Sequence, residues 1–269
     1  MSASGWFILQ MGLTVLALLW GLRLGRGRRK RAWLIMGASL GCLGVWIWLM
    51  HHPALGLDVF PARVWSYFEG TAAAPIFMLF AGTAYRLAVL PRQRMLITLA
   101  TGLGVLYFVH GGLWMLQPTP VYAFDQAVRS GTVMQSQDFS CVPAACATAL
   151  NTLGIYSTEA QMAELTLTRP GTGATVVRAL RGLQERLHQS AWRADLRQLT
   201  VEQLRCTPGP MVVPLQFEFD KQHMVVIQRW GQDGVDLDDP MLGPVHLASN
   251  DFSRCYGGQA IVFQWDNRN

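Results

Sequence analysis

The sequence predicts an N-terminal region of four transmembrane helices, residues 1–117, followed by a C-terminal α+β domain. The hydrophobic runs that are long enough to cross a bilayer all lie in the first part. The charge divides at the same place, because residues 1–117 carry a net charge of +8 and residues 118–269 a net charge of −3, within a total of +5. In the second part, helical patterns precede strand patterns, which is the order of an α+β domain.

Four hydrophobic runs predict the four membrane spans. Each has 17 to 22 residues, enough for a helix to cross a hydrocarbon core of about 30 Å. They are residues 6–22, 33–50, 71–90 and 95–116. The third contains Pro75 near its start and Arg86 near its end, where a long side chain can reach the headgroups. The first run does not resemble a signal peptide, because basic residues follow it instead of preceding it.

Basic residues predict the orientation of these spans. Six lie in the segment 23–31, and Arg86, Arg92 and Arg94 lie beside the third and fourth runs. The loop 51–70 has only Arg63 as a Lys or Arg residue. Because basic loops stay in the cytoplasm, we expect both termini outside it. The short clusters between hydrophobic runs do not form the basic patch of a nucleic-acid-binding domain, so no nucleic-acid partner is expected.

Glycines in the second run predict close helix packing. Gly37, Gly41 and Gly44 have a spacing that lets another helix approach, although glycines scattered without such a role are the alternative. The bundle could also contact other membrane proteins through such a face. The aromatic residues of the loop 51–70 are typical of a membrane interface.

The second part consists of a linker, residues 118–131, and a domain, residues 132–269. Four helices are expected in this domain. The first runs from Cys141 to Leu153, the second starts at Thr158, the third follows the turn of residues 171–175 and ends at Leu187, and the fourth runs from Thr200 to Arg205. Gly154 can cap the first of these. The expected strands are residues 211–219, 222–227, 235–239, 244–247 and 259–265, with a polar turn through Asp251 before the last.

Cys141 is the candidate nucleophile. It stands at the expected start of a helix, where unpaired backbone N–H groups and the helix dipole stabilise negative charge. Pro143 fits this position, because a first helical turn tolerates proline. The alternative is a buried, inert cysteine, which is a common environment for this residue.

A histidine and an acid follow in the order that a thiol nucleophile requires. His223 lies at the start of one strand, and Asp239 ends the next strand before Pro240. Cysteine on a helix, histidine on a strand and an acid on the following strand is the order of a papain-like Cys-His-Asp site. Since side chains alternate along a strand, Asp239 should share the inner face with Leu237, while Asp236 and Asp238 point away. We expect Asp239→Asn to lower the rate by orders of magnitude by misorienting the imidazole, and Asp238→Asn to retain most activity.

Residues 135–265 resemble the papain-like cysteine peptidases that process bacteriocins by removing double-glycine leader peptides, together with their peptidase-like relatives. The resemblance is carried by Gln135, six residues before Cys141, by the sequence His223-Met-Val-Val and by Asp239-Pro240. It implies that Cys141 is the nucleophile, His223 the general base, Asp239 the acid that orients it, and Gln135 part of the oxyanion hole. One position departs from the pattern, because Val142 stands where relatives usually have glycine.

The resemblance implies a cysteine endopeptidase that cleaves a peptide or protein, for example after Gly-Gly. The hydrophobic runs and basic loops predict that it is anchored in a bacterial inner membrane and acts at the outer face. Its partners would be that substrate and the lipid bilayer, and no cofactor or metal is expected. The absence of a Gly-x-x-x-x-Gly-Lys loop excludes the transporter to which such peptidases are often fused. A non-catalytic peptide-binding or assembly module and a thiol amidase or acyl transferase remain alternatives. Cys206 and Cys255 form a candidate disulfide, because the compartment would be oxidising.

Overall fold

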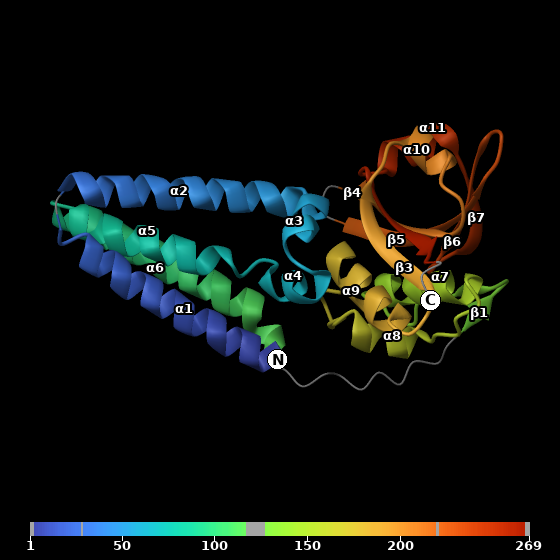
Figure 1. Cartoon of the computed structure of the whole chain (residues 1–269), viewed down its shortest axis with the longest axis horizontal. Coiled ribbons are helices and arrows are strands. Elements are labelled where there is room, and N and C mark those ends of the chain that lie inside the picture. The colour runs from blue at the N-terminus through green and yellow to red at the C-terminus, as the bar shows by residue number, and fades with distance from the viewer. Residues whose placement is uncertain (1–2, 28, 117–126, 219–220, 267–269) are drawn as a thin grey trace. The chain divides into compact units, whose positions relative to one another are not determined.

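The computed structural model describes residues 3–27, 29–116, 127–218 and 221–266. The chain divides into two compact units, Met1–Pro118 and Thr119–Asn269. The first is a bundle of long helices, and the second packs helices against a curved sheet (Figure 1).

Four helices form the body of the first unit. They are α1 (Ala3–Leu24), α2 (Arg29–His51), α5 (Ala73–Leu87) and α6 (Pro91–Gly112). Successive members of this set run in opposite directions, so the α1–α2 and α5–α6 connections lie at the same end of the bundle (Figure 1). The short helices α3 (Pro53–Val59) and α4 (Ala62–Phe68) connect α2 to α5, and the 3-10 turn η1 (Leu113–Met115) follows α6.

Three of the described helices are long and apolar enough to cross a membrane, not the four that the sequence suggested. They are Ala3–Leu24, Arg29–His51 and Pro91–Met115. In place of the predicted span 71–90, α5 has 15 residues, a length of about 22 Å at 1.5 Å per residue. The run loses its last residues because Leu90 is extended before Pro91, and the residue before a proline disfavours helical geometry.

The closest helix packing in this unit joins α1 to α5. A Cβ added to Gly21 would lie 2.5 Å from the Leu79 carbonyl oxygen, and one added to Gly82 would lie 2.6 Å from the Leu18 carbonyl oxygen. The backbones therefore approach as closely as glycine permits. The prediction for Gly37, Gly41 and Gly44 was wrong within this chain, because a Cβ on any of them would meet nothing within 4 Å. The buried residues of α2 are instead Ala32 and Ser39, which lie on a different face.

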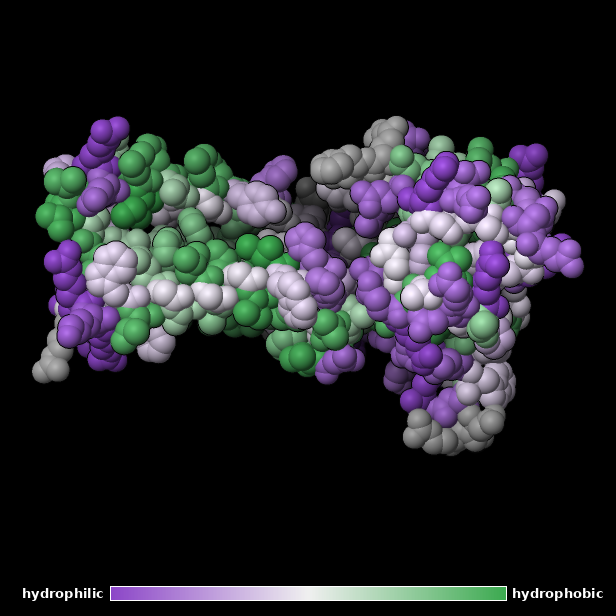
Figure 2. Space-filling view, turned by 90° about the horizontal axis from the view of Figure 1, so that it is seen from above, coloured by the Kyte–Doolittle hydropathy of each residue, from purple (hydrophilic) through white to green (hydrophobic). Residues whose placement is uncertain are grey.

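Polar and apolar surfaces are segregated along the bundle. Hydrophobic side chains cover much of the face shown in Figure 2, and hydrophilic side chains gather at one end. That end carries the α1–α2 and α5–α6 connections (Figure 1). The described basic residues in and beside these connections are Arg23, Arg26, Arg29, Lys30, Arg31, Arg86, Arg92 and Arg94.

The second unit begins with a small hairpin and three helices. Strands β1 (Val128–Arg129) and β2 (Thr132–Val133) pair across Ser130 and Gly131, both at positive φ, as a two-residue hairpin turn requires. The helices are α7 (Cys141–Thr152), α8 (Glu159–Leu165) and α9 (Val176–Leu187). The predicted stop of α7 at Gly154 is confirmed by its φ of 78°. Thr158 and Gln161 form a capping box at the start of α8.

A six-stranded antiparallel sheet follows, in the order β3-β8-β4-β5-β6-β7. Its strands are β3 (Trp192–Gln198), β4 (Met211–Glu218), β5 (Lys221–Trp230), β6 (Gly234–Asp239), β7 (Gly243–Ala248) and β8 (Gln259–Trp265). One face buries a core that includes Val213, Val225 and Leu237 beneath α10 (Val201–Arg205) and α11 (Ser249–Cys255). Helix α7 packs against β5. The predicted α+β arrangement is confirmed.

Three elements were missed from the sequence. The alternation Trp192-Arg-Ala-Asp-Leu-Arg-Gln198 is a strand signal for β3, which forms one edge of the sheet. Helix α11 replaces the polar turn expected through Asp251. Strand β1 lies at the end of the predicted linker, and β2 opens the predicted domain.

The candidate disulfide does not form in this structure, where Cys206 and Cys255 are free thiols. Cys206 is exposed, whereas Cys255 packs against the core beneath α11. The two side chains thus occupy different environments, one in solvent and the other against apolar residues.

Candidate active site

Cys141 is the first residue of α7, as the sequence predicted. Ser140 occupies the N-cap position. The backbone N–H of Cys141 is therefore one of the first N–H groups of the helix, which have no partner within the helix. Its side chain is partly exposed, whereas Cys146 is wholly buried. Burial, together with the nearby Cys141, raises the pKa of Cys146 far above its usual value, so that residue stays a neutral thiol.

The loop of residues 135–140 brings Gln135 to the same groove as Cys141. The Gln135 backbone N–H donates to the Pro240 carbonyl oxygen at 2.8 Å. The Gln135 side-chain Nε2 donates to the Gln137 carbonyl oxygen at 3.0 Å. An amide nitrogen carries two protons, so one donor is available for a substrate oxygen.

His223 and Asp239 are paired across neighbouring strands β5 and β6. The distance from His223 Nε2 to Asp239 Oδ1 is 2.9 Å. The same carboxylate oxygen accepts the Met241 N–H at 2.7 Å and the Leu242 N–H at 3.2 Å, so its own turn holds it in place. Since Nε2 faces Asp239, Nδ1 is the ring nitrogen left for Cys141.

The electrostatics of His223 favour its protonated form. Burial alone lowers its pKa, but hydrogen bonds to Asp239 and Cys141 and their negative charges outweigh burial and raise the pKa to about 9. For Asp239, burial acts to raise the pKa. The hydrogen bonds from His223 and from the Met241 N–H overcome it, and the net effect is a lowered pKa. A histidine held between a carboxylate and a cysteine is the arrangement found in thiol peptidases.

These residues line a groove of about 930 Å³. Gly171 to Thr175, from the loop before α9, form one wall, and the Phe217 ring lies 6.3 Å from the imidazole of His223. Gly173 has a φ of 65°, and a Cβ there would lie 3.1 Å from the carbonyl oxygen of Phe139, two residues before Cys141. This wall therefore approaches the backbone of the cysteine loop closely.

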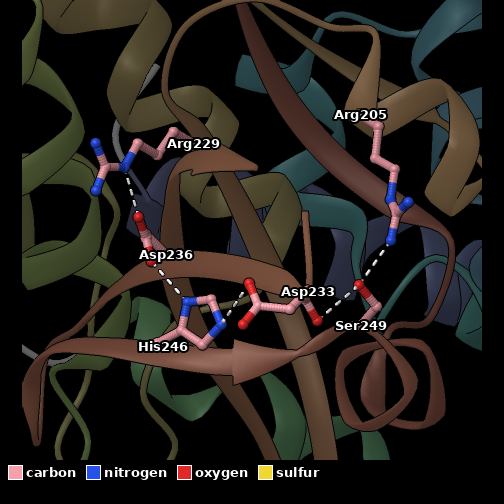
Figure 3. A network of polar contacts seen from close by, with 6 residues as sticks. All are labelled: Arg205, Arg229, Asp233, Asp236, His246 and Ser249. Atoms are coloured by element: carbon pink, nitrogen blue, oxygen red, sulfur yellow. Dashed lines mark hydrogen bonds and ion pairs between the residues drawn. The ribbon is translucent and has the colours of Figure 1, made fainter. Parts of the chain in front are cut away.

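The neighbouring aspartates on β6 have other partners. Asp238 accepts the Thr132 hydroxyl at 2.6 Å and also accepts from Gln228. Asp236 lies in a surface network with Arg229 and His246, which continues through Asp233 and Ser249 to Arg205 (Figure 3). Strand alternation thus separates Asp239 from both.

The groove beside these two aspartates is smaller than the Cys141 groove. It has a volume of about 530 Å³, and the residues lining it include no cysteine. Within the described part of the chain, no group of three or more His, Cys, Asp or Glu side chains is arranged to hold a metal ion.

The structure brings together all four residues selected from the sequence: Gln135, Cys141, His223 and Asp239. Val142, the departure from the family pattern, is buried at 3% exposure and is not one of the residues lining the groove. Sequence reasoning missed Glu159 and the backbone N–H groups that bind Asp239. The Asp239-Pro240 pair was the available signal for the turn that supplies these N–H groups. Glu159 gave no such signal, because acidic residues are common at the start of a helix.

Comparisons with known proteins find similar sequences and structures for the second unit. The model of the peptidase C39 family matches residues 129–268. An uncharacterized protein of Methanothermobacter thermautotrophicus is 34% identical over 136 residues, which cover 49% of this chain and 87% of the relative. An uncharacterized protein of Methanothermobacter marburgensis is 29% identical, with the same coverage.

Two solved structures are also similar. One is a double glycine motif protease from an AMS/PCAT transporter in complex with the leader peptide, at 18% identity and a TM-score of 0.42, covering 55% of this chain and 99% of that one. The other is the peptidase domain of Streptococcus ComA, a bi-functional ABC transporter, at 17% identity and a TM-score of 0.44, covering 49% and 96%.

Proposed function

Because the chain belongs to the peptidase C39 family, we propose that it is a cysteine endopeptidase with Cys141 as nucleophile, His223 as general base and Asp239 as the residue that orients His223. The observation that carries the proposal is the position of the His223 ring. It bonds Asp239 at 2.9 Å through Nε2 and interacts with Cys141 in the same groove.

In the acylation step, His223 holds the proton of the Cys141 thiol, and the thiolate attacks the scissile carbonyl carbon. The carbonyl oxygen becomes an oxyanion, which accepts hydrogen bonds from the Cys141 N–H and the Gln135 amide. When the intermediate collapses, the C–N bond breaks and the imidazolium gives its proton to the leaving amine. A thioester on Cys141 remains.

In the deacylation step, the neutral imidazole takes a proton from a water molecule. The resulting hydroxide attacks the thioester carbon, and the C–S bond breaks to release the acid and regenerate the thiolate and imidazolium. Asp239 stabilises the positive ring each time it forms. Its oxygen is already held by two backbone N–H groups, so it needs no rearrangement during the cycle.

We propose a peptide or protein substrate with small residues, such as two glycines, before the cleaved bond. Support comes from the sequence resemblance of Gln135, His223 and Asp239-Pro240 to peptidases that remove double-glycine leaders. Support for an extended peptide comes from the groove beside Cys141, where the small residues Gly171 to Thr175 form one wall.

We further propose that the first unit is a multi-pass anchor in a bacterial inner membrane and that the peptidase acts at the outer face. Three helices long and apolar enough to cross a membrane support the anchor. The basic connections at a single end of the bundle support the orientation, because such loops stay in the cytoplasm (Figure 1).

The test uses the full-length protein in detergent micelles and a fluorogenic peptide that ends in Gly-Gly before the coumarin amide. We expect turnover by the unaltered chain and by Cys146→Ala, and none by Cys141→Ala or His223→Ala. Mass spectrometry of a longer peptide should find both cleavage fragments. Binding of peptide without turnover would indicate a non-catalytic module, and turnover by Cys141→Ala would refute the assignment of the nucleophile.

A further inference from the structure

Glu159 is a buried carboxylate that the proposed reaction does not use. It is the first residue of α8 and is 0% exposed. Its Oε1 accepts the Ser136 backbone N–H at 3.0 Å, whereas Oε2 is buried without a hydrogen-bond partner among the described residues. Burying a carboxylate with one oxygen unpaired is unfavourable, so this placement calls for a role beyond packing.

The position of Glu159 is determined by contacts that do not involve the groove. Asn151 of α7 bonds both the N–H and the carbonyl oxygen of Ser157. Arg186 of α9 donates to the Ser157 hydroxyl and to the Tyr156 carbonyl oxygen. The capping box of Thr158 and Gln161 then starts the helix. Three elements thus hold the backbone from which the Glu159 side chain extends.

The contact of Glu159 is with the loop that carries Gln135. Three successive backbone N–H groups of this loop are satisfied. Gln135 donates to the Pro240 carbonyl oxygen, Ser136 donates to Glu159, and Gln137 donates to the Ser140 hydroxyl within the loop. Glu159 is therefore a side chain through which α8 holds this loop. The point of attachment is Ser136, which is one residue from Gln135 and five from Cys141.

We propose that Glu159 is a positioning residue for the oxyanion hole. By binding the Ser136 N–H, it holds the adjacent Gln135 amide beside Cys141. The inference rests on the proposed function, since it takes Gln135 to be an oxyanion donor. Glu159 does not touch the substrate, and its effect passes through the loop.

A pair of substitutions separates hydrogen bonding from charge. Glu159→Gln keeps the length of the side chain and an acceptor oxygen but removes the charge. Glu159→Asp keeps the charge at the start of α8 but withdraws the carboxylate from Ser136 by one methylene. Glu164→Ala is the matched control, because Glu164 is an exposed glutamate on the same helix.

Three readouts are measured on the full-length protein. They are kcat and KM on the Gly-Gly coumarin peptide, the inhibition constant of a Gly-Gly peptide aldehyde, and the rate of Cys141 alkylation by iodoacetamide. An aldehyde forms a hemithioacetal whose oxygen needs the oxyanion hole, whereas alkylation by iodoacetamide does not form an oxyanion.

For Glu159→Asp we expect about a tenfold loss of kcat, KM within about twofold, and about tenfold weaker aldehyde inhibition. This is less than the ~10² to 10³-fold loss when an oxyanion donor is removed outright. Alkylation should stay within about twofold of the unaltered chain. Glu159→Gln and Glu164→Ala should resemble the unaltered chain in all three measurements.

The opposite ranking, with Glu159→Asp active and Glu159→Gln impaired, would show that charge matters and would overturn the proposal. Equal losses of kcat and of alkylation in Glu159→Asp would indicate a general structural role and would also overturn it. Gln135→Ala separates the oxyanion role of Gln135 from the positioning role of Glu159. If this variant does not weaken aldehyde inhibition, the oxyanion assignment itself fails. If it does and the Glu159 variants do not, only the role of Glu159 fails.

Discussion

Replacing Asp239 with asparagine tests how the carboxylate acts on His223. The sequence alone suggested a loss of orders of magnitude through misorientation of the imidazole. In the structure, Asp239 Oδ1 accepts from Met241 and Leu242 as well as from His223. An asparagine oxygen held by the same two N–H groups can still accept from His223 Nε2. The substitution should therefore remove the charge and leave the ring orientation in place.

The size of the effect follows from the pKa of His223. The rise from 6.5 to about 9 corresponds to roughly 3 kcal/mol in favour of the imidazolium. Cys141 supplies part of this, and solvent screens part of it, which leaves about 2 kcal/mol for the Asp239 charge. We expect Asp239→Asn to lower kcat/KM by about 30-fold, since 1.36 kcal/mol is tenfold in rate.

The pH profile gives a second measure of the same substitution. Asp239 raises the pKa of His223, so removing its charge lowers that pKa from about 9 toward 6.5. The thiolate–imidazolium pair is lost when the ring deprotonates, and the alkaline limb of kcat/KM should therefore move to lower pH, by at least about one unit. The measurement is kcat/KM on the Gly-Gly coumarin peptide from pH 5 to 10.

Asp238→Asn is the control for this experiment. Asp238 is buried on the same strand but accepts from Thr132 and Gln228, so its substitution should leave the limb in place. The proposed electrostatic effect of Asp239 on His223 is refuted if the alkaline limb of the Asp239→Asn pH profile does not move, or if Asp238→Asn moves it by the same amount. A loss near ~10⁴-fold with an unmoved limb would point to a wrong tautomer instead.

The remaining predictions concern reactivity, packing and topology. Iodoacetamide should alkylate Cys141 and leave the buried Cys146 unmodified in the folded protein, as peptide mass mapping would show; equal labelling would contradict their different environments. Gly82→Leu should destabilise the first unit by about 1–3 kcal/mol through overpacking, whereas Gly41→Leu, facing open space, should not change its melting temperature in detergent; equal effects would contradict the α1–α5 contact. A reporter active only outside the cytoplasm, fused after Asn269, should be active, and activity of a cytoplasm-only reporter would reverse the orientation.

Local signals predicted the second unit well. The resemblance to bacteriocin-processing cysteine peptidases is confirmed by the family match. Strand alternation separated Asp239 from Asp238, because one face of β6 carries Val235 and Leu237 into the core. Thr158 and Gly154 marked helix ends through capping chemistry, which depends on adjacent residues only.

Contacts between distant segments could not be predicted from local sequence patterns. Nothing near Glu159 in the sequence shows that its side chain reaches Ser136, 23 residues earlier. In the first unit, the glycines of α2 had the expected spacing, but Gly21 and Gly82 make the close approach. Spacing identifies a helix face that permits close contact, whereas the packing of all the helices decides which faces meet.

The hydrogen bond from the Gln135 N–H to the Pro240 carbonyl oxygen has a mechanical consequence. It links the loop before Cys141 to the turn that follows Asp239, at 2.8 Å. Separating Gln135 from the Asp239 turn therefore means breaking a main-chain hydrogen bond. As long as this hydrogen bond holds, a groove that widens around a bound peptide would keep the Gln135 loop and the turn after Asp239 together.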